Sequence, residues 1–290
     1  MLRRALLVGV VVLPLLGASP AAAGRRKVTV VASFYPLAWA ARQVGGDEVK
    51  VTDLTPPGSE PHDLELTPDD RDAIEDADVV IVLGGDFQPA VEEAAKMRDG
   101  PTLSIIRKLN GESRRRARKD PHRWLDPQLM FGITDLVGEA LDEVRPGTGS
   151  SRTSLVSHAL VDLHKEFEAG LATCERGLLV TAHDAFGWLA RRYGLRHEAI
   201  AGIDPESEPS PKRLAELADL VEEEGVTTIF TEDLVSPKVA RTLAREAGGV
   251  KTAVLSPLES LTKAQRRRGD DYVDVMRENL SQLRRALGCS

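Results

Sequence analysis

Val79-Val80-Ile81-Val82-Leu83 is an unbroken run of apolar residues in the first third of the chain. A short run of this kind predicts a strand that is buried inside a sheet. Other strand-like runs flank it at residues 27–32, 49–54 and 102–106, and helix-like segments separate them. Strands that alternate with helices predict a largely parallel sheet covered by helices.

Helix starts support this alternation. Thr67-Pro68-Asp69-Asp70 provides a capping hydroxyl, a proline in the first turn and two acids that the helix dipole favours. Another helix is expected after Ser33-Phe34-Tyr35-Pro36, running to about Val44.

The second half of the chain repeats the same order of elements. Strands are expected at residues 178–181, 226–231 and 252–255. Helices are expected at residues 184–193 and after Ser210-Pro211 and Ser236-Pro237. The sequence therefore predicts two similar α/β domains with mainly parallel sheets.

One long helix is predicted between the two domains, at residues 150–175. Apolar residues recur along it at helical spacing: Val156, Leu160, Leu163, Phe167 and Leu171. A helix is stiffer than a Gly/Ser linker, so large domain swings are not expected. The expected division is an N-terminal α/β domain at 24–149, the linking helix at 150–175 and a C-terminal α/β domain at 176–290.

Residues 1–23 have the pattern of a cleaved secretory signal. Arg3 and Arg4 precede an apolar run at residues 5–16, and Ala21-Ala22-Ala23 offers small residues for cleavage. The apolar run is too short to span a membrane. No cysteine lies near the cleavage point, so we expect an exported, periplasmic protein without a lipid anchor there.

The net charge, a basic stretch and the two cysteines bear on possible partners and on disulfide formation. The formal net charge is −7, and loss of the two signal arginines makes it −9, so nucleic-acid binding is not expected. The basic stretch at residues 113–119 is expected to be an exposed, mobile loop rather than a docking patch for an anionic partner. Cys174 and Cys289 form no disulfide framework or metal motif, and pairing is the less favoured state.

Three of the six histidines lie in short segments that contain aspartate, and two of these segments also contain proline. These segments are Ser59-Glu60-Pro61-His62-Asp63, Asp120-Pro121-His122 through Asp126-Pro127, and Thr181-Ala182-His183-Asp184. Each follows a predicted strand, and ligands of open α/β sheets bind beyond the carboxyl ends of the strands. Neutral imidazole is a common metal ligand, so the pattern predicts a metal site between the domains. The other histidines, at positions 158, 164 and 197, are expected on the surface.

These segments resemble those of the metal-specific solute-binding proteins of ABC importers, the zinc and manganese group called cluster A-I. The similar segments cover nearly the whole mature chain. Besides the histidine segments they are Ser33-Phe34-Tyr35-Pro36, Thr67-Pro68, Tyr193-Gly194-Leu195, Ser256-Pro257-Leu258-Glu259 and a last helix with Tyr272, Met276 and Asn279. The resemblance implies a monomer that captures a divalent metal and delivers it to the membrane permease of an ABC importer.

The resemblance also implies four metal ligands: His62, His122, His183 and Glu259. Glu60 and Glu232 remain alternatives to Glu259. Glu60 lies close to His62 in the sequence, and Glu232 follows a predicted strand. Three further acids are expected to hydrogen-bond to the histidine rings without binding the ion themselves: Asp63, Asp126 and Asp184.

Three imidazoles and one carboxylate favour Zn2+, with Mn2+ as the alternative because manganese prefers more oxygen donors. Residues 107–120 lack the histidine-rich loop of many zinc-importing members, which weakens the zinc assignment. A zinc-dependent hydrolase is a different class of function. Four protein ligands would leave no open position for water, and no His-Glu-x-x-His motif is present, so we do not expect an enzyme. A surface adhesin is a third possibility that the missing lipid anchor disfavours.

Overall fold

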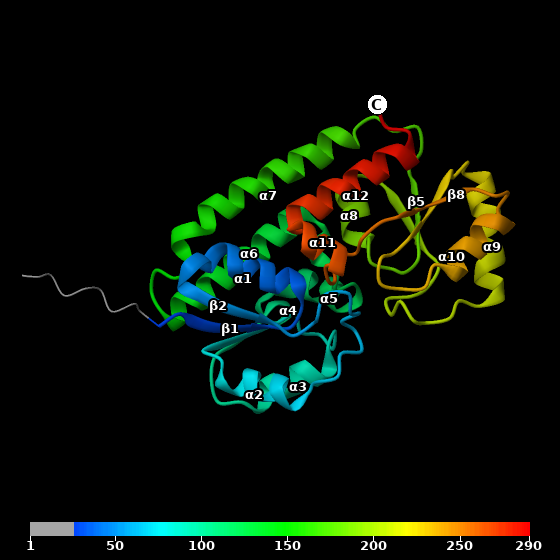
Figure 1. Ribbon diagram of the computed structural model, residues 1–290. Helices are drawn as coiled ribbons and strands as arrows, with labels where there is room; N and C mark the ends of the chain where they lie inside the picture. Colours follow the sequence, from blue (N-terminus) through cyan, green and yellow to red (C-terminus); the bar gives the residue numbers. More distant parts are fainter. Residues whose placement is uncertain (1–25) are drawn as a thin grey trace, which may run out of the picture.

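The computed structural model describes residues 26–290 and contains two α/β units, each built on a four-stranded parallel sheet (Figure 1). The first sheet has the order β2-β1-β3-β4, with β1 at Val28–Ala32, β2 at Val49–Asp53, β3 at Val79–Val82 and β4 at Thr102–Ser104. The second has the order β6-β5-β7-β8, with β5 at Leu178–Thr181, β6 at Arg196–Ala199, β7 at Thr228–Thr231 and β8 at Lys251–Val254. The predicted fold class is confirmed.

The predicted secretory signal at residues 1–23 lies outside the described residues. Within residues 26–290, no helix combines the length and the apolar character that a membrane crossing requires.

The central strands of both sheets are the apolar runs of the sequence. Every residue of β3, β5 and β7 is buried, whereas the edge strand β2 alternates between buried and more exposed positions. Val30 of β1 pairs with Val79 of β3, and Val180 of β5 pairs with Ile229 of β7. In each sheet the strand order reverses between these two central strands, which is where α/β proteins place ligands.

Helices cover both sheets, and most begin with the chemistry expected for them. Thr67 and Asp70 form a reciprocal capping box at α2, and the Ser210 side chain caps α9. The helices of the first unit are α1 (Tyr35–Gly45), α2 (Pro68–Asp76), α3 (Pro89–Met97), α4 (Ile105–Lys108), α5 (Gly111–Lys119) and α6 (Pro127–Val144), with 3-10 turns η1 (Gly46–Glu48) and η2 (Arg123–Leu125). The remaining helices are α7 (Ser150–Gly170), α8 (Gly187–Arg192), α9 (Pro211–Glu223), α10 (Lys238–Glu246), α11 (Lys263–Arg268) and α12 (Tyr272–Leu287).

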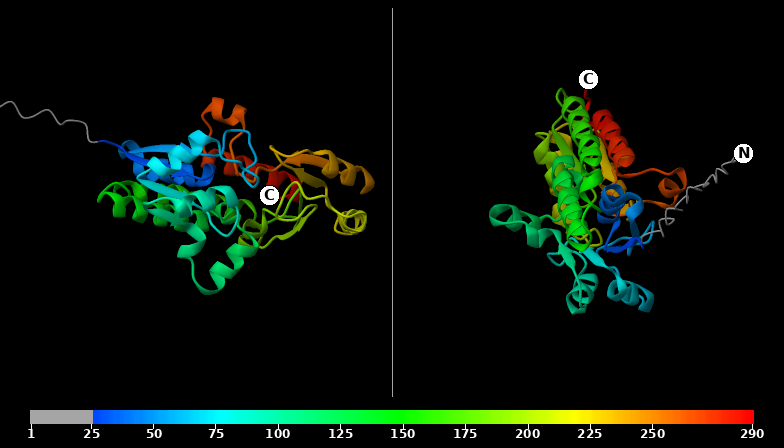
Figure 2. Two further views of the ribbon diagram at one scale, coloured as in Figure 1. Left: turned by 90° about the horizontal axis from the view of Figure 1, so that it is seen from below. Right: turned by 90° about the vertical axis from the view of Figure 1, so that its left-hand side faces the viewer.

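The long helix α7 lies beside α12 along one side of the molecule (Figures 1 and 2). Its predicted apolar positions are buried: Val156, Leu160, Leu163, Phe167 and Leu171. The helix ends at Gly170 rather than near Glu175. Helix α12 starts against the first unit, where the Tyr272 hydroxyl donates to the Trp124 carbonyl at 2.5 Å. The domain boundaries at 149 and 175 stay a prediction, because α12 packs on both units.

Other local features also differ from the predictions. The basic stretch at 113–119 was expected to be a mobile loop, but it lies in helix α5, where Glu112 pairs with Arg115 and Arg116 one turn away. Strand β4 ends at Ser104 because the chain then turns into α4. Strand β6 was not predicted because it is a polar edge strand, held by its pairing with β5.

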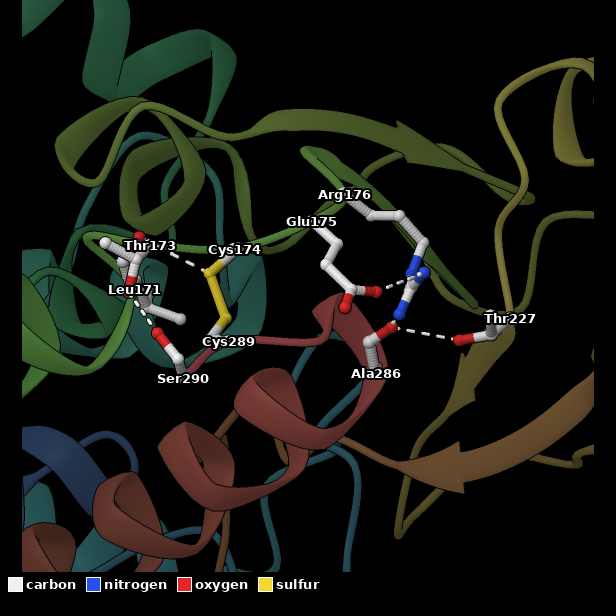
Figure 3. The surroundings of a disulfide bond; sticks show 9 residues. All are labelled: Leu171, Thr173, Cys174, Glu175, Arg176, Thr227, Ala286, Cys289 and Ser290. Carbon is white, nitrogen blue, oxygen red and sulfur yellow. Dashed lines mark hydrogen bonds and ion pairs between the residues drawn. A yellow bond between two sulfur atoms is a disulfide. The ribbon is translucent and has the colours of Figure 1, made fainter.

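Cys174 and Cys289 form a disulfide, the state that the sequence left open but did not favour (Figure 3). The chain end returns beside the end of α7, where the Ser290 backbone N–H donates to the Thr173 carbonyl at 3.1 Å. Arg176 Nε donates to the Ala286 carbonyl at 3.3 Å in the same region. The disulfide joins two cysteines that are 115 positions apart in the sequence, so local spacing did not indicate it.

Candidate metal centre

The four residues implied by the resemblance lie together between the two units. One ligand atom from each of His62, His122, His183 and Glu259 lies within 4.8 Å of all the others. Oε1 of Glu259 lies 3.2 Å from Nε2 of His62, 3.1 Å from Nε2 of His122 and 3.5 Å from Nε2 of His183. The three imidazoles therefore face a single carboxylate oxygen.

This spacing suits a small four-coordinate ion. Zinc bonds of about 2.0–2.1 Å in a tetrahedron place neighbouring ligand atoms about 3.3–3.4 Å apart. The Nε2 atoms of His122 and His183 are 3.4 Å apart, and the three distances to Glu259 bracket the same value. The donor set, three nitrogens and one carboxylate oxygen, also fits zinc.

The ligand side chains come from loops at the ends of strands and turns. His62 lies between β2 and α2, and His122 lies between α5 and η2. His183 follows β5, and Glu259 follows β8. The residues His122 and His183 are fully buried and Glu259 is 2% exposed, whereas the His62 side chain is 10% exposed. His62 therefore lies on the side of the centre that is nearest to solvent.

A carboxylate lies behind each buried histidine ring. Asp120 Oδ1 accepts from the backbone N–H of His122 and lies next to its ring Nδ1, both at 3.1 Å. Glu232 accepts in the same way from His183. A carboxylate on Nδ1 keeps the proton there and leaves Nε2 free to bind a metal. Glu232 thus faces the far side of the His183 ring, away from Glu259.

Glu60 lies next to the group but makes a different contact. Its Oε2 accepts from the backbone N–H of His62 at 2.9 Å, and its Oε1 lies 3.9 Å from Nε2 of His62. Within the described part of the chain, this Oε1 is buried and has no hydrogen-bond partner. Burial raises the pKa of Glu60 to about 7, against the opposing effect of His62.

The three acids expected to support the histidine rings have other contacts. Asp63 is exposed. Asp126 accepts from Arg192 Nε at 2.7 Å and caps α6, and Asp184 lies 3.4 Å from His197. The sequence did contain a usable signal for Asp120, because an acid, a proline and a histidine follow one another at both residues 60–62 and residues 120–122.

The loops that carry the ligands are tied to each other across the two units. Trp124 Nε1 of the first unit donates to the Pro257 carbonyl at 2.7 Å, two residues before Glu259. Asn279 of α12 accepts from the Ser256 N–H at 2.9 Å and donates to the Ser256 carbonyl at 2.7 Å. Leu258 is buried in a left-handed conformation with φ 55°, which is uncommon for a branched side chain. These contacts hold Glu259 in place opposite the histidines.

The charges of the centre are strongly coupled. Burial alone would lower the pKa of His183, but the carboxylates of Glu232 and Glu259 raise it to about 10. Burial also opposes charge on His122, yet Asp120 and Glu259 raise the pKa of His122. The three imidazoles hold the pKa of Glu259 well below its usual range despite its burial. The raised pKa values of the two histidines mean that protons compete with a metal ion for this centre.

The other histidines lie outside the centre. His158 is exposed, and His164 Nδ1 lies 3.1 Å from the Tyr193 hydroxyl. The expectation of a surface position was wrong for His197, whose side chain is 7% exposed and lies 2.8 Å from the Thr181 hydroxyl. Its contact with Thr181 at the end of β5 explains this burial.

The known proteins that this chain is similar to are named for zinc binding or zinc uptake. Residues 30–286 match the family described as "Zinc-uptake complex component A periplasmic". The chain is 33% identical over 287 residues to the zinc-binding protein AdcA of Streptococcus pyogenes, covering 89% of this chain and 56% of that protein. It is 34% identical over 283 residues to the high-affinity zinc uptake system protein ZnuA of Bacillus subtilis, covering 90% of this chain and 88% of that protein.

Solved structures agree with these sequence matches. The Zn(II)-bound ZnuA-like domain of Streptococcus pneumoniae AdcA superposes with a TM-score of 0.77 at 32% identity, covering 90% of this chain and 99% of that domain. The chain spans about half the length of the streptococcal proteins it matches, 56% in the case above.

Proposed function

The chain belongs to the family of periplasmic zinc-uptake components, and on this basis we propose that it captures Zn2+ and delivers it to the membrane permease of an ABC importer. The observation that carries the proposal is the convergence of three Nε2 atoms on one oxygen of Glu259, at 3.1–3.5 Å. This arrangement has the size and the donor atoms that a tetrahedral zinc ion requires.

We assign His62, His122, His183 and Glu259 as the ligands of the captured ion. Asp120 and Glu232 position two of the rings and add negative charge behind them, which favours a divalent cation. The exposed side of His62 is the proposed route by which the ion enters and leaves.

The arrangement of ligands in this centre favours capture of a zinc ion over catalysis by one. A catalytic zinc keeps one position for water, but four protein donors fill a tetrahedron. The family is one of transport components rather than of hydrolases. Mn2+ is also less favoured, because it prefers oxygen donors and would need Glu60 as a further ligand.

The family is periplasmic. The finer proposal is that residues 1–23 direct export and are removed, and that the mature chain acts as a monomer without a lipid anchor. The export, the cleavage and the missing lipid anchor rest on Ala21-Ala22-Ala23, which is followed by Gly24 and Arg25 rather than by a cysteine that could accept lipid. The monomer rests on the family resemblance alone.

A titration of metal-depleted protein with Zn2+ tests capture directly. One tight site per chain is expected, together with a higher melting temperature, because the ligands come from both units and exist as a set only in the folded state. A matched assay with generic ester and peptide substrates should show no zinc-dependent hydrolysis. Absence of tight binding, or several equivalent sites, would contradict the proposed centre. Delivery is tested by zinc uptake into vesicles that hold the importer, with and without the loaded protein.

A further inference from the structure

A cavity lies in the first unit, between the end of β3, helix α3, strand β4 and the α4–α5 segment. Its volume is about 750 Å3, which is within the range of small-molecule sites. None of the four proposed zinc ligands lines it. Helix α5 stands away from the body of the molecule in both views of Figure 2. The cavity is therefore separate from the metal centre.

Basic side chains dominate the lining of this cavity. They come from α3, from the turn after it, and from α4 and α5: Lys96, Arg98, Arg107, Arg114 and Arg118. The acids that line it are Asp86 and Glu92. This excess of positive charge is unusual in a chain whose formal net charge is −7.

The bases of α5 divide into two groups. Arg114 and Arg118 are one helical turn apart and line the cavity. Arg115 and Arg116 do not line it and instead pair with Glu112, at 2.9 and 3.1 Å. The helix thus directs one pair of arginines toward the cavity and neutralises part of the charge of the other pair.

Some of the lining bases remain available to a ligand. Arg98 is committed, because its guanidinium donates to the carbonyls of Ile74, Ala77 and Pro101. The Arg114 guanidinium likewise donates to two backbone carbonyls, those of Leu109 and Arg107. Within residues 26–290, the guanidinium groups of Arg107 and Arg118 make no hydrogen bond or ion pair, and both side chains line the cavity. Both guanidinium groups can therefore bind an anion without breaking an existing ion pair.

The acid Glu92 is already engaged on the wall of the cavity. It is 8% exposed, and its two oxygens accept from the backbone N–H groups of Asp86 and Gln88, at 3.3 and 3.4 Å. These two hydrogen bonds hold the loop after β3, where Gly84, Gly85 and Asp86 all have positive φ. Glu92 is therefore less able to pair with the arginines opposite.

A buried hydroxyl provides independent support for a ligand. Ser104, at the carboxyl end of β4, lines the cavity and is 8% exposed. Within the described residues its Oγ is buried and has no hydrogen-bond partner. A buried hydroxyl without a partner is costly, and a ligand oxygen in the cavity could accept its hydrogen bond.

We propose that this cavity binds a small multivalent oxyanion, a phosphate compound or a polycarboxylate, through Arg107, Arg118 and Ser104. Arginine matches both groups because its planar fork can bind two oxygens at once. The cavity reaches the carboxyl ends of β3 and β4, at Val82 and Ser104, and such ends are a usual place for a ligand in α/β sheets.

Calorimetric titrations of the zinc-loaded protein test this proposal with inorganic phosphate, pyrophosphate and citrate as probes, at constant ionic strength. Saturable binding of one equivalent is expected for at least one probe, and the preferred probe separates phosphate from carboxylate ligands. Arg107→Gln combined with Arg118→Gln should weaken this binding by about tenfold to a hundredfold. Ser104→Ala should weaken it by a smaller factor.

The matched control is Arg115→Gln combined with Arg116→Gln. It removes the same charge from the same segment without changing the cavity, so probe affinity should stay within about twofold of the parent, as for other surface changes. Zinc affinity should be equal in both double variants. Equal loss of probe binding in the two would overturn the proposal, because it would indicate general attraction to a basic surface. Failure of all three probes to saturate would overturn it as well.

Discussion

Glu232 accepts two hydrogen bonds from His183, one from the backbone N–H at 3.0 Å and one from the ring Nδ1 at 2.7 Å. These two hydrogen bonds determine both the orientation and the tautomer of the His183 ring, whose Nε2 faces Glu259. Glu232→Gln should keep the zinc stoichiometry at one but weaken affinity by about tenfold to a hundredfold, the usual effect of losing such a partner. Competition with a zinc chelator measures the change. The exposed Glu223, replaced in the same way, serves as the control and should bind like the parent.

Replacement of a proposed ligand should be more severe. Alanine at His62, His122 or His183, or Glu259→Gln, should each weaken zinc binding beyond the roughly hundredfold effect of an outer partner, because a donor atom is lost. His158→Ala should have no effect, since this histidine is exposed on α7. Similar losses from His158→Ala and His183→Ala would show that the centre is misassigned.

Zinc affinity should rise with pH. The pKa of His183 is raised to about 10 and the pKa of His122 is also raised, so the metal-free centre holds protons at neutral pH that zinc must displace. Calorimetry in buffers of different ionisation enthalpy should report proton release between about pH 6.5, the unperturbed histidine value, and the raised pKa. A constant affinity and no proton release across this range would contradict a three-histidine centre.

The metal-free protein should show the opposite trend in stability. A histidine whose pKa is raised by folding stabilises the folded state fully below its unfolded pKa of about 6.5, and this contribution is lost as pH rises toward the folded value. The melting temperature of the metal-free protein should therefore fall as pH increases from about 6.5 to 10. Saturation with zinc should reduce this dependence, because the ion replaces the protons. A zinc-saturated sample that loses as much stability over this pH range would contradict the prediction.

Reduction of the disulfide should destabilise the fold without removing the metal centre. Loss of a native disulfide that closes a long loop typically costs about 2–5 kcal/mol in the free energy of unfolding. Urea unfolding with and without a reductant measures this cost. The variant with serine at both Cys174 and Cys289 should resemble the reduced protein and should not respond to the reductant. Its zinc stoichiometry should remain one.

The sequence predicted the central strands because their apolar runs allow few other structures. Strands β3, β5 and β7 are buried throughout, and each was expected within a few residues of its observed bounds. Strand β6 was missed because residues Arg196, His197 and Glu198 have no apolar pattern, and only pairing with β5 makes them a strand. Helix α6 was also missed, although Asp126 and Pro127 provide a cap and a first-turn proline.

The family resemblance implied which four residues form the centre, but only the fold shows how they lie relative to one another. Distances among His62, His122, His183 and Glu259 depend on how the two sheets are placed, which no spacing in the sequence encodes. The supporting carboxylates were assigned to the wrong neighbours for the same reason. Glu232 is 49 residues from His183 in sequence, and it reaches that ring only because β5 and β7 are adjacent in the sheet.

The disulfide between Cys174 and Cys289 closes most of the second unit into a covalent ring that includes both His183 and Glu259. Exposed loops are the usual sites of proteolytic cleavage, and the segment at residues 204–208 is such a loop. A single cut there would open the ring without separating the two pieces. In an environment that contains proteases, the protein could be nicked once in this unit and still keep both ligands on one covalent molecule, until a reductant released the fragment.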